Sequence, residues 1–267
     1  MSLQSFPMTD AFGIAGILQQ DGCVVIRGAL PALLIERYAS GVARSLDYID
    51  MLRRQGAQSE VSFSEYTRGM LAQDGQSGFS LSFQLNSDLL MPMYLQQVFH
   101  AMREHHFLRL ATLVFGRRAA FMVDNSSARR QLPDRPETGL LLHQDVGAAQ
   151  ISSSGQSGLT FWVPLVPIDA RTPTLEILTI RVDEVLPHRF DDRGYSVLLE
   201  QEQLRAKLGG RFEPVTGLEP GDVVAFTSRT VHGTVVPPGA DRIRYSLDIR
   251  CRPVDELVGS YAGTMLA

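Results

Sequence analysis

Two histidines and one aspartate are the residues of this chain whose types and spacing point most directly to chemistry. His143 and Asp145 are separated by one residue, and His232 lies far downstream. Side chains at positions i and i+2 of a β-strand share one face, so His143 and Asp145 can present two metal ligands from one segment. A distant second imidazole completes a two-histidine, one-carboxylate face, which is diagnostic of non-haem Fe(II) centres that activate O2. The sequence therefore predicts a site formed by His143, Asp145 and His232.

Taken singly, each of these residues also has an ordinary structural explanation. A His-x-Asp triplet occurs by chance as a surface pair, and a lone histidine such as His232 is more often structural than a ligand. Gly233, directly after His232, permits a close backbone approach beside the histidine. A third polar element shifts the balance towards a metal site.

That third element is a segment of alternating polarity at residues 241–251, in which Arg242, Arg244 and Ser246 share one face. A guanidinium can hold a carboxylate with two parallel hydrogen bonds, and a hydroxyl can add a third. Fe(II) oxygenases that use 2-oxoglutarate bury the far carboxylate of this cosubstrate, where an unpaired charge is costly. We expect Arg244 and Ser246 to hold it, with Arg242 as the competing arginine; a solvated strand face is the alternative.

The N-terminal third of the chain must support this site, and its pattern is mainly helical. We expect a short helix over residues 10–22 and a buried strand over residues 23–27. Apolar residues at spacings of three and four predict amphipathic helices over residues 31–54 and 88–115. Residues 55–87 between them are rich in Gly, Ser, Gln and Asp, which predicts a long loop or lid.

From residue 119 onward, short strands separated by turns replace the helical pattern. Turn sequences such as Pro-Gly-Asp at residues 220–222 separate many of them. This order favours an antiparallel barrel or sandwich buttressed by helices, and hence a mostly β, α+β protein. The predicted strands are Ala119–Val123, Leu140–Asp145, Leu159–Leu165, Thr174–Ile180, Arg211–Pro214, Val223–Thr227, Thr230–Val236 and Arg242–Arg250.

Composition sets the broad class. The chain has 267 residues, 44% of them hydrophobic, and a formal net charge of −4, which fits a globular protein without a nucleic-acid-binding surface. No apolar run is long enough to span a bilayer, and the N-terminus lacks a signal-peptide pattern, so we expect no membrane partner. The isolated cysteines Cys23 and Cys251 predict buried free thiols and a reducing cytoplasm.

Without a repeat or a clear linker, residues 1–267 are expected to form one domain, with a mainly helical part at 1–118 and a strand-rich core at 119–252.

Several segments, in order, resemble the phytanoyl-CoA dioxygenase family of Fe(II)/2-oxoglutarate-dependent oxygenases over most of the chain. They are Asp-Gly-Cys-Val-Val-Ile-Arg-Gly at 21–28, His-Gln-Asp at 143–145, Phe-Trp-Val-Pro-Leu at 161–165, Gly-Asp-Val-Val-Ala-Phe at 221–226 with His-Gly at 232–233, and Arg-Tyr-Ser at 244–246.

This resemblance implies a double-stranded β-helix core, also called a jelly roll and similar to the cupins, with flanking helices. It implies that His143, Asp145 and His232 bind Fe(II) and that Arg244 and Ser246 bind 2-oxoglutarate. Gln131 and Thr234 are further candidates for the cosubstrate. One departure concerns residues 172–178, which lack the Asn-Gly-x-Leu and Pro-Gly-Ser-His stretches of many members. Because that region often faces the substrate, the resemblance does not carry a substrate over to this chain.

The function expected is a dioxygenase that consumes O2 and 2-oxoglutarate, releases succinate and CO2, and oxidises a C–H bond of a small organic molecule. Hydroxylation is the leading reaction, in secondary or amino-acid metabolism, with desaturation or ring closure as variants. The carboxylate of Asp145 argues against halogenation, since related halogenases have a small residue there. The alternatives are a metal-stabilised jelly roll that binds a ligand without catalysis and a zinc hydrolase with the same ligands.

Overall fold

The fold is described from a computed structural model of the protein. Its main parts are two β-sheets and a set of helices that covers one of them, and a two-stranded hairpin lies beside the sheets. The structure describes residues 3–54, 78–80, 92–123, 125–147, 157–192, 195–208, 211–256 and 265–266. Most of the predicted lid, residues 55–77 and 81–87, lies outside the described residues. Among the described residues, no helix combines the length and the apolar character needed to cross a bilayer.

The larger sheet supplies the strands that matter most for the site. Its order is β1 (Ser5–Pro7), β2 (Cys23–Arg27), β11 (Val223–Thr227), β6 (Leu159–Pro164), β13 (Arg244–Pro253), β4 (Ala119–Met122) and β14 (Met265–Leu266). A further strand, β5 (Ser127–Gln131), pairs with β13 and with β3 (Gly78–Ser80). Strand β6 is buried along its whole length, as a strand covered on both faces should be.

The smaller sheet faces the larger one across an apolar layer. It consists of β10 (Phe212–Pro214), β7 (Thr174–Leu178) and β12 (His232–Val235). Trp162 and Phe226 of the larger sheet pack in one buried cluster with Leu175 and Ile177 of the smaller sheet. Together the two sheets form a jelly-roll core. A separate hairpin of β8 (His188–Phe190) and β9 (Ser196–Leu198) lies beside it.

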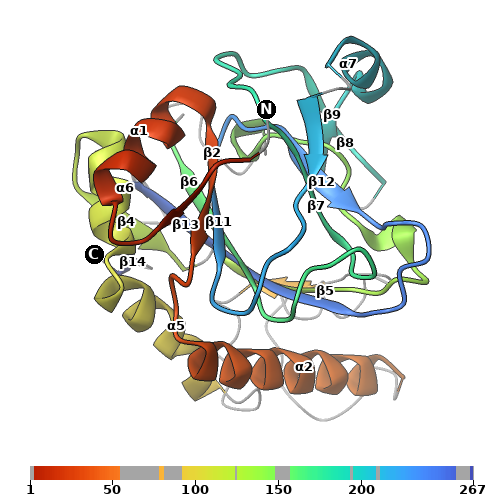
Figure 1. Cartoon of the computed structure of the whole chain (residues 1–267). Helices are drawn as coiled ribbons and strands as arrows, with labels where there is room; N and C mark the ends of the chain where they lie inside the picture. The colour runs from red at the N-terminus through yellow and green to blue at the C-terminus, as the bar shows by residue number, and fades with distance from the viewer. Residues whose placement is uncertain are drawn as a thin grey trace.

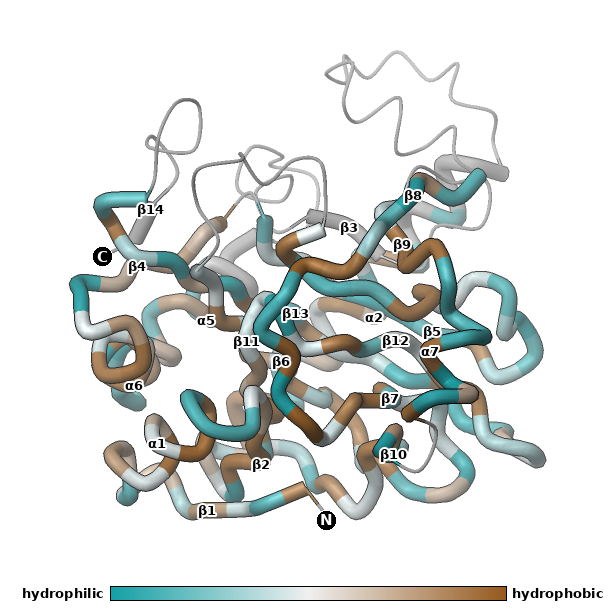
Figure 2. The backbone as a smooth tube through the Cα atoms, turned by 90° about the horizontal axis from the view of Figure 1, so that it is seen from above, coloured by the Kyte–Doolittle hydropathy of each residue, from teal (hydrophilic) through white to brown (hydrophobic). Residues whose placement is uncertain are grey.

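The helices cover the outer face of the larger sheet. They are α1 (Ala11–Asp21), α2 (Ala32–Arg54), α5 (Pro92–Glu104) and α6 (Phe107–Phe115), while α7 (Gln201–Leu208) lies beside the hairpin. Seen from above, β6 and β11 run between α1 and α6 on one side and β7 and β12 on the other (Figure 2). A second cluster of buried apolar residues joins these helices to the sheet. It includes the ring contacts of Phe99 with Phe121 and of Phe107 with Phe161. Figure 1 shows α2 running below the sheet, where it contacts β5 and β13.

The structure confirms most of the predicted elements and the two buried free cysteines, but one predicted helix is wrong. Residues 92–115 form two helices, because His106 adopts a left-handed conformation with φ of 66° between them. The buried positions reflect this break: Met102 is followed by Phe107, five residues later, and not by a residue three or four positions on.

The predicted strand Leu140–Asp145 is also wrong. Only His143 forms a bridge there, and Asp145 begins the short 3₁₀ helix η2 (Asp145–Gly147). Two other short 3₁₀ helices, η1 (Pro136–Thr138) and η4 (Val254–Glu256), flank strands of the larger sheet. The strands β5, β8 and β9 and the helix α7 were not predicted, since their short polar sequences have no clear hydrophobic period.

Candidate active site

The three predicted metal ligands meet in the interior of the protein. One ligand atom from each of His143, Asp145 and His232 lies within 4.8 Å of the others, and all three residues are buried. The Nε2 atom of His143 is 3.9 Å from Oδ1 of Asp145, and the two imidazole centroids are 4.2 Å apart. This donor set, two imidazoles and one carboxylate on one side, fits a non-haem Fe(II) ion.

The main chain fixes the two histidines relative to each other. The amide of His143 donates to the carbonyl of His232 at 2.9 Å, and the amide of His232 donates back to the carbonyl of His143 at 3.0 Å. A Cβ on Gly233 would lie 3.1 Å from the amide nitrogen of Leu142, so the absence of a side chain permits this approach, as the sequence suggested. The segment around His143 is therefore held against β12 although it is not a regular strand.

Hydrogen bonds also orient both imidazole rings. The Nδ1 atom of His143 is 2.8 Å from the carbonyl of Leu141, and Nδ1 of His232 is 3.0 Å from the carbonyl of Thr230. In each ring Nδ1–H then donates to a carbonyl, which leaves the lone pair of Nε2 for a metal. Burial, together with the nearby His232, lowers the pKa of His143 to about 3, so its ring is neutral at pH 7, as ligation requires.

Both oxygens of the Asp145 carboxylate have protein partners. The hydroxyl of Thr160 donates to Oδ2 at 2.6 Å, and Nη2 of Arg250 donates to Oδ1 at 2.7 Å. Burial alone would raise the pKa of Asp145, but Arg250, the two histidines and Thr160 hold it well below its ordinary value. The carboxylate is therefore ionised before any metal binds.

Gln144, between the two ligands, has its hydrogen-bond partners on other segments of the chain. Its Nε2 atom donates to the carbonyls of Glu184 and Arg229 at 3.0 and 2.7 Å, and its Oε1 atom accepts from the amide of Leu186 at 2.8 Å. Arg229 lies three residues before His232, so this one amide links the chain around His143 and Asp145 to the turn that leads to His232.

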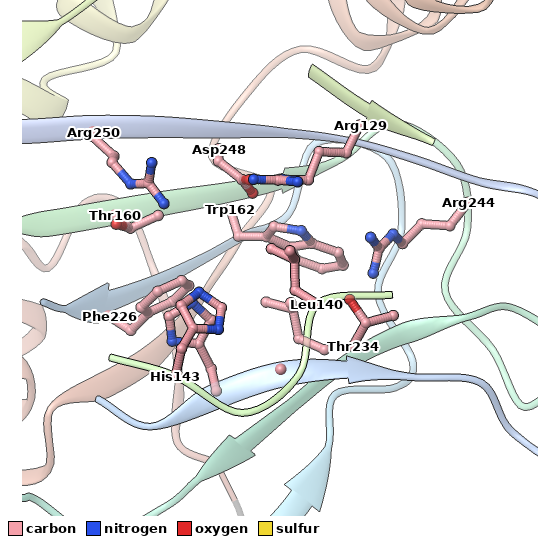
Figure 3. Close-up of a pocket in the computed structure, with 13 residues that line it drawn as sticks. Arg129, Leu140, His143, Thr160, Trp162, Phe226, Thr234, Arg244, Asp248 and Arg250 are labelled. Atoms are coloured by element: carbon pink, nitrogen blue, oxygen red, sulfur yellow. The ribbon is translucent and has the colours of Figure 1, made fainter. Parts of the chain in front are cut away.

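A cavity adjoins the two histidines, and Arg244 lines it. Its volume of about 350 Å³ includes space that is open to solvent. Figure 3 shows the guanidinium of Arg244 beside Trp162, 5.9 Å from the indole ring centre. Arg244 is only 2% exposed, yet its Nε and Nη1 atoms have no hydrogen-bond partner among the described residues. Burial lowers its pKa to about 10, so the group remains charged at neutral pH. A buried guanidinium that is charged and incompletely paired destabilises the folded protein unless an anion binds to it.

The structure separates the other predicted cosubstrate residues. Thr234 lines the same cavity as Arg244. Ser246, on the same face of β13, has a buried hydroxyl without a partner among the described residues. Gln131 pairs with Arg244 across β5 and β13, and its Oε1 atom is also buried and unpaired within the described chain. Arg242 is exposed and donates to Asp169 at 2.6 Å, so it lies outside the cavity.

Three further charged residues line the cavity, Arg129, Asp248 and Arg250. The sequence favoured a surface position for Arg129 and assigned no role to the other two. Arg129 donates from Nε to Oδ2 of Asp248 at 2.6 Å, while Arg250 pairs with Asp145. A signal was present, because Asp248 and Arg250 share the strand face of Arg244 and Ser246. Thr160, which holds Asp145, had no comparable signal.

No protein-family model and no curated protein sequence matches this chain. The family resemblance of the sequence segments therefore stays a prediction.

Solved structures do match the fold. AviO1 from Streptomyces viridochromogenes Tue57 is 19% identical, with a TM-score of 0.59 over 91% of this chain and 95% of that protein. The non-heme alpha-ketoglutarate-dependent epimerase SnoN from nogalamycin biosynthesis is 18% identical, with a TM-score of 0.56 over 92% of this chain and 83% of that protein. The carbocyclase SnoK from the same biosynthesis is 14% identical, with a TM-score of 0.59 over 91% and 83%.

These likenesses show that the chain has the jelly-roll fold found in non-haem iron, 2-oxoglutarate-dependent enzymes. At these identities they show the fold alone, so the function must be argued from the site. SnoN has also been solved in complex with Fe3+, alpha ketoglutarate and nogalamycin RO.

Proposed function

We propose that this protein is an Fe(II)- and 2-oxoglutarate-dependent oxygenase that uses O2 to oxidise a C–H bond of a small organic molecule and releases succinate and CO2. The observation that carries the proposal is the pairing of two features in one place. A buried two-histidine, one-carboxylate group lies beside a cavity into which a charged, incompletely paired arginine points.

The metal part of the proposal is supported by the state of the three ligands. Both imidazoles have an Nε2 lone pair available, and the carboxylate is ionised. With three protein ligands, the iron would keep coordination positions for O2 and the cosubstrate. His143, Asp145 and His232 would hold the iron.

The cosubstrate part is supported by the unpaired atoms of Arg244 and Ser246. The far carboxylate of 2-oxoglutarate would accept two parallel hydrogen bonds from the guanidinium and one from the hydroxyl. Thr234 lines the same cavity and Gln131 lies directly across from Arg244, so both are candidates for further contacts. Because Arg242 is already paired with Asp169 at the surface, we assign the carboxylate to Arg244.

When bound, iron and 2-oxoglutarate would supply the activation of O2 and the oxidising power that breaks a C–H bond. The protein contributes position and environment. Trp162, Phe226 and Leu140 line the cavity and exclude water around the polar groups. Thr160 and Arg250 hold the Asp145 carboxylate in one orientation, and Gln144 fixes the segment that carries it. These hydrogen bonds would hold the three ligand side chains in place when the metal binds.

Hydroxylation is our leading proposal for the reaction, with the chain as a cytoplasmic member of the phytanoyl-CoA dioxygenase family. Epimerisation and carbocyclisation are the activities printed for SnoN and SnoK, and both are alternatives on the same fold. The carboxylate at position 145 occupies the place that a halide would need, which argues against halogenation.

Anaerobic addition of Fe(II) and 2-oxoglutarate to the purified protein tests the proposal. We expect a visible charge-transfer absorption band that requires both components, and O2-dependent release of succinate when air is admitted. A folded protein that binds Fe(II) but gives neither signal would instead be a metal-stabilised binding protein. Zn(II)-dependent ester hydrolysis without succinate would identify a hydrolase.

A further inference from the structure

We propose that a second cavity beside Asp145 is the substrate subsite and that Arg250 binds a carboxylate group of the substrate there. This inference rests on the proposed function, since it takes Asp145 to be a metal ligand.

The second cavity lies next to Asp145, and its volume of about 240 Å³ includes space that is open to solvent. Asn125, Gly158 and Cys251 contribute to its wall, together with Asp145 itself. Thr160 and Arg250 line both this cavity and the one that contains Arg244. In Figure 3, Arg250 and Arg244, both from β13, lie on opposite sides of the pocket, with Trp162 between them. A substrate in the second cavity would therefore lie on the side of the metal site away from the cosubstrate carboxylate.

The guanidinium of Arg250 is hydrogen-bonded at Nη1 and Nη2 but not at Nε. Its Nη1 atom donates to the backbone carbonyl and to Oδ1 of Asn125 at 2.8 and 3.1 Å. Its Nη2 atom donates to Oδ1 of Asp145 at 2.7 Å, while its Nε atom is buried without a partner among the described residues. The anchor at Asn125 keeps the group in the cavity. On the Nε–Nη2 edge, Nη2 already donates to Asp145, so Nε and one hydrogen of Nη2 remain for a further partner.

Metal binding would change the charge balance around Arg250. The Oδ1 atom of Asp145 is the oxygen that lies 3.9 Å from Nε2 of His143, whereas Oδ2 is held by Thr160. Oδ1 is therefore the oxygen directed at the metal. One carboxylate charge cannot neutralise both a divalent ion and a guanidinium.

The other charged residues of the cavity do not make up this deficit. Apart from Asp145, Asp248 is the one carboxylate among the described residues that line the two cavities; it lines the first, and Arg129 already pairs with it at 2.6 Å. Arg244 is itself a cation and needs the far carboxylate of 2-oxoglutarate. With metal and cosubstrate bound, Arg250 keeps one positive charge without a matching anion.

The geometry of the open edge indicates which anion. Nε and Nη2 are parallel donors in one plane, the arrangement that binds a carboxylate through both oxygens. The structure therefore assigns the substrate to small organic molecules that carry a carboxylate. A neutral isostere would leave the guanidinium unpaired and should bind more weakly.

A pair of simple probes tests this assignment without knowledge of the natural substrate. The full-length protein is loaded anaerobically with Fe(II) and saturating 2-oxoglutarate, and propionate or its neutral isostere propionamide is added at constant ionic strength. The charge-transfer band reports binding next to the metal. We expect propionate to shift the band at a concentration about tenfold or more below that of propionamide, the ratio that one charge-assisted hydrogen bond supplies.

Variants locate the effect. Arg250→Gln should lose the preference for propionate. Arg250→Lys should keep part of it, because the positive charge remains but the two parallel N–H donors of the guanidinium are lost. The exposed control Arg242→Gln should keep all of it. If Arg250→Gln gives no band, the comparison of Arg250→Lys with wild type decides. A tenfold increase in 2-oxoglutarate should leave the propionate response unchanged.

The outcomes separate this inference from the function on which it rests. A wild-type protein without a charge-transfer band overturns the proposed function and the subsite with it. A normal band that responds equally to both probes, or to neither, overturns the subsite alone. A propionate response that 2-oxoglutarate displaces places the probe at Arg244 and also overturns the subsite.

Discussion

The two ends of the cavity differ in how far the protein completes its own hydrogen bonds. At the metal end, both oxygens of Asp145 and the Nδ1 atoms of both histidines have protein partners. At the other end, Arg244 and Ser246 keep buried polar atoms without partners among the described residues. The first end is organised before any ligand arrives, and the second is completed only by an anion. The unpartnered buried atoms of Arg244 and Ser246 therefore indicate where we expect a ligand to bind.

Removal of a ligand side chain should have the largest effect, because it damages the organised end. Asp145→Ala and His143→Ala should each abolish Fe(II)-dependent succinate formation while the far-ultraviolet circular dichroism spectrum is retained. The exposed carboxylate variant Asp169→Ala is the matched control. Succinate formation near the wild-type rate in either ligand variant would mean that the metal lies elsewhere.

At the incomplete end, Arg244→Leu should raise the 2-oxoglutarate concentration for half-maximal activity by about 100-fold, since hydrogen bonds to a charged group contribute roughly 3 kcal/mol at most. Arg242→Leu is the control and should change it little, because Arg242 is exposed and paired with Asp169. Steady-state kinetics with varied 2-oxoglutarate measure both. Equal effects would remove the distinction between the two arginines.

A third test addresses the ion pair of Arg129 with Asp248, two residues that line the cavity. Burial would raise the pKa of Asp248, but Arg129 and Arg250 lower it below the usual value. A carboxyl with a lowered pKa stabilises the fold above its unfolded pKa of about 3.9, and this contribution is lost as the pH falls towards the folded value. Asp248→Asn should therefore cost about 3 kcal/mol of unfolding free energy at pH 7.

Urea unfolding at pH 7, 4 and 3 measures this loss, and the gap between Asp248→Asn and wild type should narrow as the pH falls. A gap that stays constant or widens below pH 4 would show that Asp248 acts by packing and not by its charge.

The smallest expected effect concerns the approach of main chains beside the ligands. An added Cβ in Gly233→Ala would lie 3.1 to 3.2 Å from backbone atoms of Leu140, Leu141 and Leu142, which cannot easily move. We expect a loss of about 1 kcal/mol in stability and a severalfold weaker affinity for Fe(II). Gly16→Ala in α1 is the control, since nothing lies within 4 Å of its Cβ and alanine favours a helix. Thermal unfolding and metal titration compare the two, and equal behaviour would contradict a tight approach at Gly233.

Much of the fold was predictable because long apolar periods specify it. The sequence predicted α1, α2 and the central strands β2, β6 and β11 close to their observed bounds. It failed where one residue or a tertiary contact decides the structure. The left-handed His106 splits a continuous apolar stripe, and η2 replaces a strand end that only the bridge to His232 stabilises.

The site shows the same division between local pattern and tertiary contact. Residue types suggested His143, Asp145 and His232, but the reason given, one strand face, was wrong, since Asp145 reaches the site from a 3₁₀ turn. The alternation of β13 identified Arg244, yet it could not separate it from Arg242, because the strand begins only at Arg244. The pairing of Arg250 with Asp145 depends on side chains that meet only in the folded protein.

The mutual main-chain hydrogen bonds between His143 and His232 have a consequence for how the protein could lose its metal. The two histidines belong to one hydrogen-bonded pair of main-chain segments, so neither segment can move away while the other stays in place. Dissociation of the ion should then be concerted with opening of that pair, and the amide protons of both residues should exchange with solvent at one common rate that slows on metal loading.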